Sequence, residues 1–346
     1  MRKYPPSLAL NLGRYRAKSA ALNIQSRLRH HAKLNRGGSP HATAYRARIS
    51  PLRYTHTEMT AIVQIRAVEV SGASAEEKER QLLAKLSDIP SVIVALSGGA
   101  DSAYLAWAAQ RALGNRALSV TALSPSYSTH DRNIVEDLVQ AQNIHHEFVE
   151  THEMDNPAYR ANAADRCFFC KDELFSVLDA LAQQRGFTAT AYGVNADDAL
   201  DFRPGHRAAK EHRVLAPLLD AGMRKSEIRA LSQRAGLPTW DRPASACLAS
   251  RVPYGTEVTP ERLSLVERGE AALRALGFRQ FRVRLHDKLA RVEIAPDEMP
   301  QALTPEMAAA IAKELKAVGF AYVSLDLEGY RQGSLNETLK RQNTLE

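Results

Sequence analysis

The residues best suited to chemistry in this 346-residue sequence are a glycine-rich hexapeptide and three cysteines. The hexapeptide, SGGADS at 97–102, follows the apolar run SVIVAL and leads directly into the helix-forming run AYLAWAA. Glycines let backbone N–H groups close around a phosphate, and the N-terminus of the next helix favours an anion. The segment therefore predicts a pyrophosphate cradle made by Ser97, Gly98, Gly99 and Ser102, with Asp101 as a contact for Mg²⁺.

The spacing of the hexapeptide narrows the kind of nucleotide chemistry. It is neither the GxxxxGK spacing of the Walker loop nor the GxGxxG spacing of the dinucleotide loop, which disfavours a kinase and a dehydrogenase. The alternative is a glycine turn that only joins a strand to a helix. The six matching residues between a strand pattern and a helix pattern favour the nucleotide loop.

The cysteines form a close pair, Cys167 and Cys170 in RCFFCKDELF, and a distant third, Cys247 in RPASACLASR. So few cysteines favour metal binding or chemistry over a disulfide framework. Three converging thiolates would bind three irons of a 4Fe-4S cluster and leave the fourth iron open. A zinc site would need a fourth ligand that is not evident, and a cysteine that merely packs as a small hydrophobe is the other alternative.

The elements that must position these residues alternate along residues 74–193. Strand patterns at 91–96, 117–123, 146–149 and 188–193 alternate with helix patterns at 102–113, 130–142 and 171–185. Alternating strands and helices predict an α/β fold with a doubly wound parallel sheet. Ligands in such sheets bind beyond the carboxyl ends of the strands.

The pattern changes after residue 255. A helix at 260–276, a hairpin formed by FRVRLH and LARVEIAP, a helix at 304–317 and the strand pattern FAYVSLDLEGY follow. They predict a smaller α+β domain with an antiparallel sheet. We therefore expect a nucleotide domain over 59–255 and a substrate-binding or oligomerisation domain over 256–346.

Charge is distributed unevenly. Residues 1–58 hold 12 Lys and Arg against a single acid, whereas the remainder holds 34 against 38 acids. The basic leader is compatible with a transit peptide, a nucleic-acid-binding arm or a mis-assigned start before Met59, and we favour the last. No apolar run reaches the roughly 20 residues of a membrane helix, so the body is expected to be cytoplasmic.

Taken together, the motifs resemble a known family. SGGxDS is similar to the PP-loop of the ATP pyrophosphatases. Several further segments in order, from RCFFCKDELF through YGVNADDALDFRPGHR and DRPASACLASRVPYGTEVTPERL to RVRLHDKLARVEIAP, resemble the LarE-type sulfur transferases of nickel-pincer nucleotide cofactor synthesis. The resemblance spans about residues 93–296 and excludes the leader.

The resemblance implies a specific reaction. ATP, cleaved to AMP and pyrophosphate with Mg²⁺, adenylates a carboxylate of pyridinium-3,5-biscarboxylic acid mononucleotide, and sulfur then displaces AMP to give a thiocarboxylate. Some members sacrifice the cysteine matched by Cys247, and others carry a 4Fe-4S cluster on three cysteines. Because all three are present here, the resemblance implies the cluster-dependent version, held by Cys167, Cys170 and Cys247. It also implies a homo-oligomer. A small-molecule nucleotide substrate and a sulfide-donating protein are the further partners to consider.

Other residues are weaker candidates. Arg282 and Arg284 alternate along FRVRLH, and the resemblance implies that they bind the phosphate of the nucleotide substrate, although a solvated strand face is the alternative. Arg251 lies four residues after Cys247 and is a candidate catalytic residue. The remaining candidates are four carboxylates and one amide. Glu267 and Glu270 lie on the helix expected at 260–276, where an exposed helix face is the alternative. Asn195, Asp197 and Asp198 follow the strand at 188–193, where residues that suit a turn are the alternative.

Three other functions remain open at this stage. A tRNA thiolation enzyme of the same superfamily also pairs SGGxDS with three cysteines, but the body outside the leader carries more acids than bases, which disfavours nucleic acid. A GMP or NAD synthetase-like amidotransferase would leave the cysteines without a purpose. A non-catalytic nucleic-acid binder acting through the leader would leave the hexapeptide unexplained.

Overall fold

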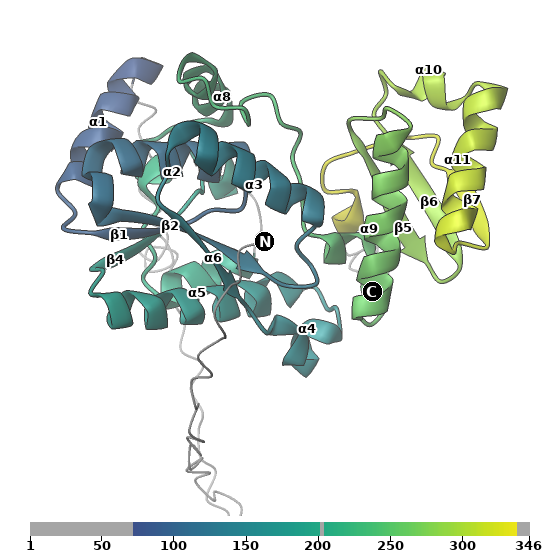
Figure 1. The fold of residues 1–346 in the computed structure, drawn as a ribbon, viewed down its shortest axis with the longest axis horizontal. Helices are drawn as coiled ribbons and strands as arrows, with labels where there is room; N and C mark the ends of the chain where they lie inside the picture. Colours follow the sequence, from purple (N-terminus) through teal and green to yellow (C-terminus); the bar gives the residue numbers. More distant parts are fainter. Residues whose placement is uncertain (1–71, 201–203, 338–346) are drawn as a thin grey trace, which may run out of the picture. The chain divides into compact units, whose positions relative to one another are not determined.

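The computed structural model describes residues 72–200 and 204–337 (Figure 1). The expectations about the leader at 1–58 lie outside the described residues. Those that are described all fall within one compact unit.

The described strands are β1 Val92–Ala95, β2 Ala117–Leu123, β3 His146–Glu150, β4 Ala189–Tyr192, β5 Phe281–His286, β6 Leu289–Ile294 and β7 Tyr322–Leu325. The described α-helices are α1 Ala75–Ser87, α2 Ala100–Leu113, α3 Thr129–Gln142, α4 Pro157–Arg160, α5 Arg166–Arg185, α6 Pro204–Glu211, α7 Pro217–Asp220, α8 Lys225–Arg234, α9 Pro260–Ala275, α10 Met299–Ala302 and α11 Pro305–Val318. Hydroxyl side chains cap several helices by accepting a backbone N–H of the first turn, as Ser74, Ser128, Thr259 and Thr304 do.

The first sheet confirms the predicted α/β class. Its order is β3-β2-β1-β4, and every pairing is parallel. Helices cover both faces, with α2 and α3 on one side and α5 and α6 on the other (Figure 1). Since β1 pairs with β2 on one side and with β4 on the other, the strand order reverses at β1. The loops after β1 and β4 therefore open into the same crevice.

The two faces of β1 explain why its sequence is apolar throughout. Val92 and Val94 pack into a core shared with α1, α2 and α8, whereas Ile93 and Ala95 pack into a core shared with β2 and α5. Side chains alternate along a strand, so a strand covered by helices on both faces must be apolar at every position.

The second sheet has the order β5-β6-β7. The hairpin β5–β6 is antiparallel as predicted, but β6 pairs with β7 in parallel, so the expectation of a wholly antiparallel sheet is wrong. The reason is the connection: α10 and α11 carry the chain back to its starting end, and such a crossover yields a parallel neighbour.

The core beneath the second sheet contains side chains from both sides of the predicted domain boundary at residue 255. It joins apolar side chains of α9, β5, β6 and α11 to Leu248, Val252 and Tyr159. Cys170 and Cys247 pack at its border. The division into domains at residue 255 stays a prediction, and the core shows that the cysteine segments rest on the C-terminal elements.

Candidate active site

The loop between β1 and α2, the predicted phosphate cradle, folds tightly against the start of α2. Gly98 has a φ of +79°, and a Cβ there would lie 3.0 Å from Val135 Cγ2, so only glycine suits the position. The Ser102 hydroxyl donates to the Gly99 carbonyl at 3.1 Å and accepts from Ser97 N at 3.2 Å. These bonds fold the loop back onto the first turn of α2. The predicted cradle residues are therefore gathered around one helix N-terminus.

Asp101 lies at the centre of the crevice between β1 and β4. Asn195, just after β4, donates from Nδ2 to Asp101 Oδ2 at 3.1 Å. Asp101 Oδ1 is buried and has no hydrogen-bond partner among the described residues. Burial raises the pKa of this carboxyl, and the Asp198 carboxylate raises it further, against the lowering effects of Lys225 and Asn195. A buried acid with one uncompensated oxygen is suited to a cation.

The close packing of β4 against α2 fixes this geometry. A Cβ on Gly193, the residue after β4, would lie 2.6 Å from Ser102 N and 2.7 Å from Ser102 Cα. Only a residue without a side chain lets the two segments approach so closely. Asp197 accepts Lys225 N at 2.8 Å, so this acid holds the start of α8.

The three cysteines are brought to one region by separate segments. Cys167 and Cys170 lie in the first two turns of α5, and Cys247 precedes the short 3₁₀ helix η5, Leu248–Arg251. All three are free thiols; Cys167 is exposed and the other two are half-buried. Loss of hydration raises the pKa of Cys167 even though its side chain reaches the surface, and Cys247 raises it further. Burial, and then Cys247, likewise raise the pKa of Cys170.

Arg166 ties the two cysteine segments together. Its guanidinium donates to the Ala249 carbonyl at 2.9 Å and to the Asn162 side chain. Asn162 in turn donates to the carbonyls of Pro253 at 2.8 Å and Thr256 at 2.9 Å. Arg166 is 2% exposed, and Cys247 and Cys167 raise its pKa against the opposing effect of burial. A permanent cation thus lies beside the thiols.

Arg251 is a structural clamp for the segment that carries Cys247. Its guanidinium pairs with Glu270 at 2.7 and 3.2 Å, and Nη1 donates to the carbonyls of Ala246 at 2.6 Å and Cys247 at 3.2 Å. These contacts engage the guanidinium in holding the segment; the catalytic role of Arg251 stays a prediction. Glu267, in contrast, accepts Thr129 N at 2.6 Å and holds the start of α3.

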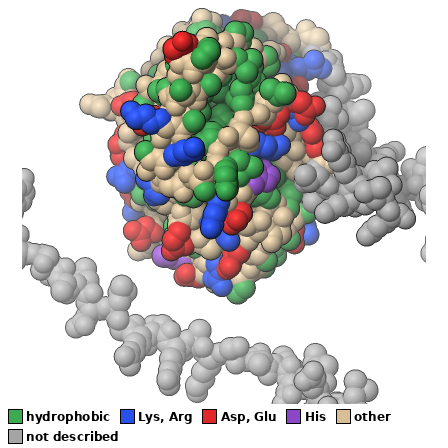
Figure 2. Space-filling model, turned by 90° about the vertical axis from the view of Figure 1, so that its right-hand side faces the viewer, with side chains coloured by type: hydrophobic (Ala, Val, Ile, Leu, Met, Phe, Trp, Pro, Cys, Tyr) green, Lys and Arg blue, Asp and Glu red, His purple; other side chains and the backbone are tan. Residues whose placement is uncertain are grey.

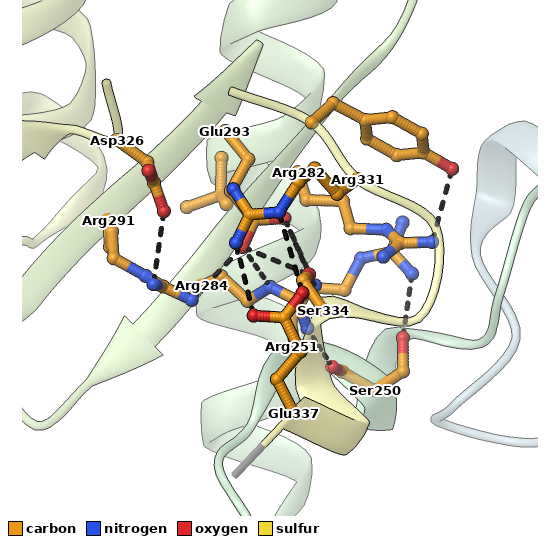
Figure 3. Close-up of polar contacts among 12 residues, drawn as sticks. Ser250, Arg251, Arg282, Arg284, Arg291, Glu293, Asp326, Arg331, Ser334 and Glu337 are labelled. Atoms are coloured by element: carbon orange, nitrogen blue, oxygen red, sulfur yellow. Dashed lines mark hydrogen bonds and ion pairs between the residues drawn. The ribbon is translucent and has the colours of Figure 1, made fainter. Parts of the chain in front are cut away.

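The two arginines of β5 differ in their surroundings (Figure 3). Arg284 is 1% exposed and pairs with Glu293 at 2.9 and 3.0 Å, with further bonds to the Ser250 carbonyl and the Ser334 hydroxyl. Arg282 lies 4.6 Å from the centre of the Tyr330 ring and donates to its hydroxyl at 3.2 Å. Burial lowers the pKa of Arg282. Arg282 is thus the better placed of the two for a phosphate; binding by either stays a prediction.

No sequence pattern selected the residues that bind the carbonyls of the segment before Cys247. Arg229 binds the carbonyls of Trp240 and Arg242, and the Tyr330 hydroxyl binds that of Ala244. Arg242 donates to the Gly98 carbonyl at 2.5 Å and pairs with Asp131. The only sequence signal was the unusual density of arginines near DRPASAC. Arg242 joins the phosphate loop to the cysteine segment.

Comparison with known proteins agrees with this geometry. No protein-family model matches the chain. It is 42% identical over 266 residues to an uncharacterized protein of Synechocystis, covering 77% of this chain and 99% of that one. It is 32% identical over 270 residues to the pyridinium-3,5-bisthiocarboxylic acid mononucleotide synthase of Lactiplantibacillus plantarum, covering 78% of this chain and 97% of the relative. The chain belongs to the LarE-type sulfur transferase family.

A more distant match is an uncharacterized protein of Methanocaldococcus jannaschii, 29% identical over 170 residues, which covers 49% of this chain and 66% of the relative. No helix in the part of the chain that the structure describes is long and apolar enough to cross a membrane.

The residues of this LarE-type chain suit the two metals that its family implies. Mg²⁺ commonly uses one or two carboxylates together with substrate phosphates, and Asp101 with its unpartnered Oδ1 provides one such carboxylate beside the cradle. Across residues 72–200 and 204–337, no three His, Cys, Asp or Glu side chains are grouped to hold a single metal ion. A 4Fe-4S cluster is larger than an ion and takes thiolate ligands, of which the free cysteines Cys167, Cys170 and Cys247 would supply three.

Proposed function

We propose that this protein is an ATP-dependent sulfur transferase. It adenylates a carboxylate of pyridinium-3,5-biscarboxylic acid mononucleotide and converts it to a thiocarboxylate in nickel-pincer nucleotide cofactor synthesis. The observation that carries the proposal is the connection of one segment to two sites. Residues 242–249 bind the phosphate loop through Arg242 and the cysteine helix α5 through Arg166.

In the first step, a substrate carboxylate oxygen attacks the α-phosphorus of ATP, and pyrophosphate leaves. The backbone N–H groups around Gly98 and Gly99 and the N-terminus of α2 bind the departing phosphates. Asp101 would hold Mg²⁺, which when bound would offset their charge. Asn195 binds Asp101 Oδ2, and Oδ1 has no hydrogen-bond partner among the described residues.

In the second step, sulfur donates an electron pair to the acyl carbon, a C–S bond forms and the bond to AMP breaks. Cys167, Cys170 and Cys247 would hold a 4Fe-4S cluster, which when bound would supply an iron-held sulfide as nucleophile. Arg251 holds the carbonyls beside Cys247, and Arg166 holds the neighbouring turn to α5. Splitting the reaction into adenylation and displacement replaces one difficult step with two easier ones.

A small-molecule substrate is favoured over tRNA by the charge on the body. Figure 2 shows basic and acidic side chains interspersed over one face of the molecule. A nucleic-acid-binding surface would present Lys and Arg on a continuous stripe.

The experiment separates the two steps. The enzyme is purified without oxygen, and pyrophosphate release and thiocarboxylate formation are measured in parallel. Asp101→Asn should abolish pyrophosphate release, whereas Asp137→Asn, an exposed acid of α3, should not. Cys167→Ser or Cys170→Ser should keep pyrophosphate release and lose both cluster absorbance and repeated turnover. Multiple turnovers in either cysteine variant, or normal pyrophosphate release by Asp101→Asn, would contradict the proposal.

A further inference from the structure

The hydroxyl group of Tyr159 is a buried hydrogen-bond donor that no group of the chain accepts. Tyr159 lies in the short helix α4 and is 1% exposed. Its Oη has no hydrogen-bond partner among the described residues. A buried hydroxyl nearly always has a partner, because an unpaired one loses its hydration without compensation. The hydroxyl is therefore available to a ligand.

Two of the three cysteines lie beside this side chain. Tyr159 belongs to the core beneath the second sheet, and Cys170 and Cys247 pack at the border of that core. Burial raises the pKa of the Tyr159 hydroxyl, and the charges of Cys247 and Cys170 raise it further. The phenol consequently keeps its proton at neutral pH and acts as a donor rather than as a base.

The polar side chain nearest in effect to the Tyr159 hydroxyl is already engaged. Ser126 lowers the pKa of Tyr159, but its own Oγ donates to Glu153 Oε1 at 3.0 Å. The Ser126 carbonyl accepts Leu248 N at 3.0 Å, which holds the residue after Cys247. Ser126 thus fixes the cysteine segment and does not satisfy the tyrosine.

The backbone at Tyr159 is tied to both cysteine segments. Its carbonyl accepts Asn162 N at 3.1 Å. The Asn162 side chain accepts from Arg166 at the start of α5 and donates to the Thr256 carbonyl at 2.9 Å. The hydroxyl therefore cannot reach another acceptor without a movement of these segments.

A second tyrosine near the thiols provides a contrast. Burial raises the pKa of Tyr254, Arg166 lowers it, and Cys167 and Cys247 raise it. The Tyr254 hydroxyl, however, donates to Asn336 Oδ1 at 3.0 Å. The chain satisfies this hydroxyl and leaves that of Tyr159 unpaired, so the two residues form a matched pair for experiment.

Sulfur is the acceptor that these surroundings favour. A neutral thiol accepts hydrogen bonds weakly, whereas an inorganic sulfide bound to iron carries negative charge and accepts them more strongly. Hydrogen bonds to the sulfurs are among the factors that set the reduction potential of an iron–sulfur cluster. A phenol supplies such a bond without adding a charge to the core.

We propose that Tyr159 is a hydrogen-bond donor to an inorganic sulfide held at Cys167, Cys170 and Cys247. The inference rests on the function proposed above and adds a residue that binds the sulfur. The acceptor is a sulfide of the cluster or an added sulfide on its open iron, and both have the same chemistry. The bond stabilises the more negative, reduced form and thereby raises the reduction potential.

The test measures the reduction potential of the reconstituted cluster in the full chain, without ATP or substrate. Tyr159→Phe removes only the hydroxyl. One ordinary hydrogen bond changes an equilibrium about fivefold, so the ratio of reduced to oxidised cluster at a fixed potential should fall by that factor, about 40 mV in a one-electron couple. Tyr254→Phe is the matched control and should leave the potential unchanged. A shift with and without added sodium sulfide identifies a sulfide of the cluster, and a shift only with it identifies the added sulfide.

Urea unfolding of the cluster-free protein supplies a second readout. Because the hydroxyl lacks an acceptor in the chain, Tyr159→Phe should unfold at the same urea concentration as the wild type or at a higher one. A lower midpoint would give the hydroxyl a partner within the chain and overturn the proposal.

Two results of the potential measurement would also overturn it. One is an equal potential in wild type and Tyr159→Phe at equal iron content, and the other is the same shift in Tyr254→Phe. Because no ATP takes part, a wild type that fails to adenylate would refute the first step of the proposed function and leave the shift intact. A wild type that assembles no cluster would refute both this proposal and the proposed route of sulfur delivery.

Discussion

Replacing Arg251 by leucine should destabilise the protein and release the segment that carries Cys247. Arg251 and Glu270 are only 6% and 7% exposed at their side chains and pair at 2.7 Å. Removing one partner of such a pair leaves the other charge buried, which costs about 3–5 kcal/mol. We expect Arg251→Leu to lower the free energy of unfolding by about this amount in urea titrations at pH 7, and Arg268→Leu to change it little.

The double variant Arg251→Leu/Glu270→Leu separates stability from positioning. Removing both charges should recover most of the lost stability, because a hydrophobic pair of similar volume commonly replaces a buried ion pair at little cost. The carbonyls of Ala246 and Cys247 would still lack their donor. Hydrogen bonds from a charged donor are worth about 1.5–3 kcal/mol, so thiocarboxylate formation should stay at least about tenfold below the wild type. Pyrophosphate release should change much less.

Two results would refute this reasoning. If the double variant regains both stability and wild-type sulfur transfer, Arg251 does not position Cys247, and its contacts serve only to satisfy Glu270. If the single variant is as stable as the wild type, the buried pair is not formed as the structure shows it.

Two further predictions concern the α/β sheet. Burial lowers the pKa of His146 from its ordinary value of 6.5 to about 4; the unfolded chain therefore binds the extra proton first as pH falls. Stability should be lost between pH 6.5 and 4, by up to about 3 kcal/mol, and His146→Gln should reduce that slope in urea titrations. Gly193→Ala should weaken ATP binding in calorimetry and lower stability, because its Cβ would meet the backbone of Ser102 at 2.6 Å. Unaltered ATP affinity in this variant would show that the cradle tolerates the displacement.

The local and periodic features of this protein follow from its sequence. The apolar run at 92–95, the hexapeptide at 97–102 and the alternation of strand and helix patterns were sufficient to predict a parallel sheet with a cradle at the end of β1. These features depend on neighbouring residues and on backbone preferences. The wholly antiparallel second sheet was predicted wrongly, because the direction of β7 depends on the helices that precede it.

Only the tertiary structure decides which charged side chains form ion pairs. From the sequence, Arg251, Arg282 and Arg284 were equivalent cations near a cysteine or on a strand. In the folded chain Arg251 pairs with Glu270 and Arg284 pairs with Glu293, while Arg274, which no motif marked, forms no ion pair with a carboxylate of the described residues. Ion pairing is a contact between residues distant in sequence, and spacing along the chain carries no information about it. For the same reason, no sequence pattern marked Arg242 and Arg166. Each donates a hydrogen bond to a backbone carbonyl more than 80 residues away in the sequence.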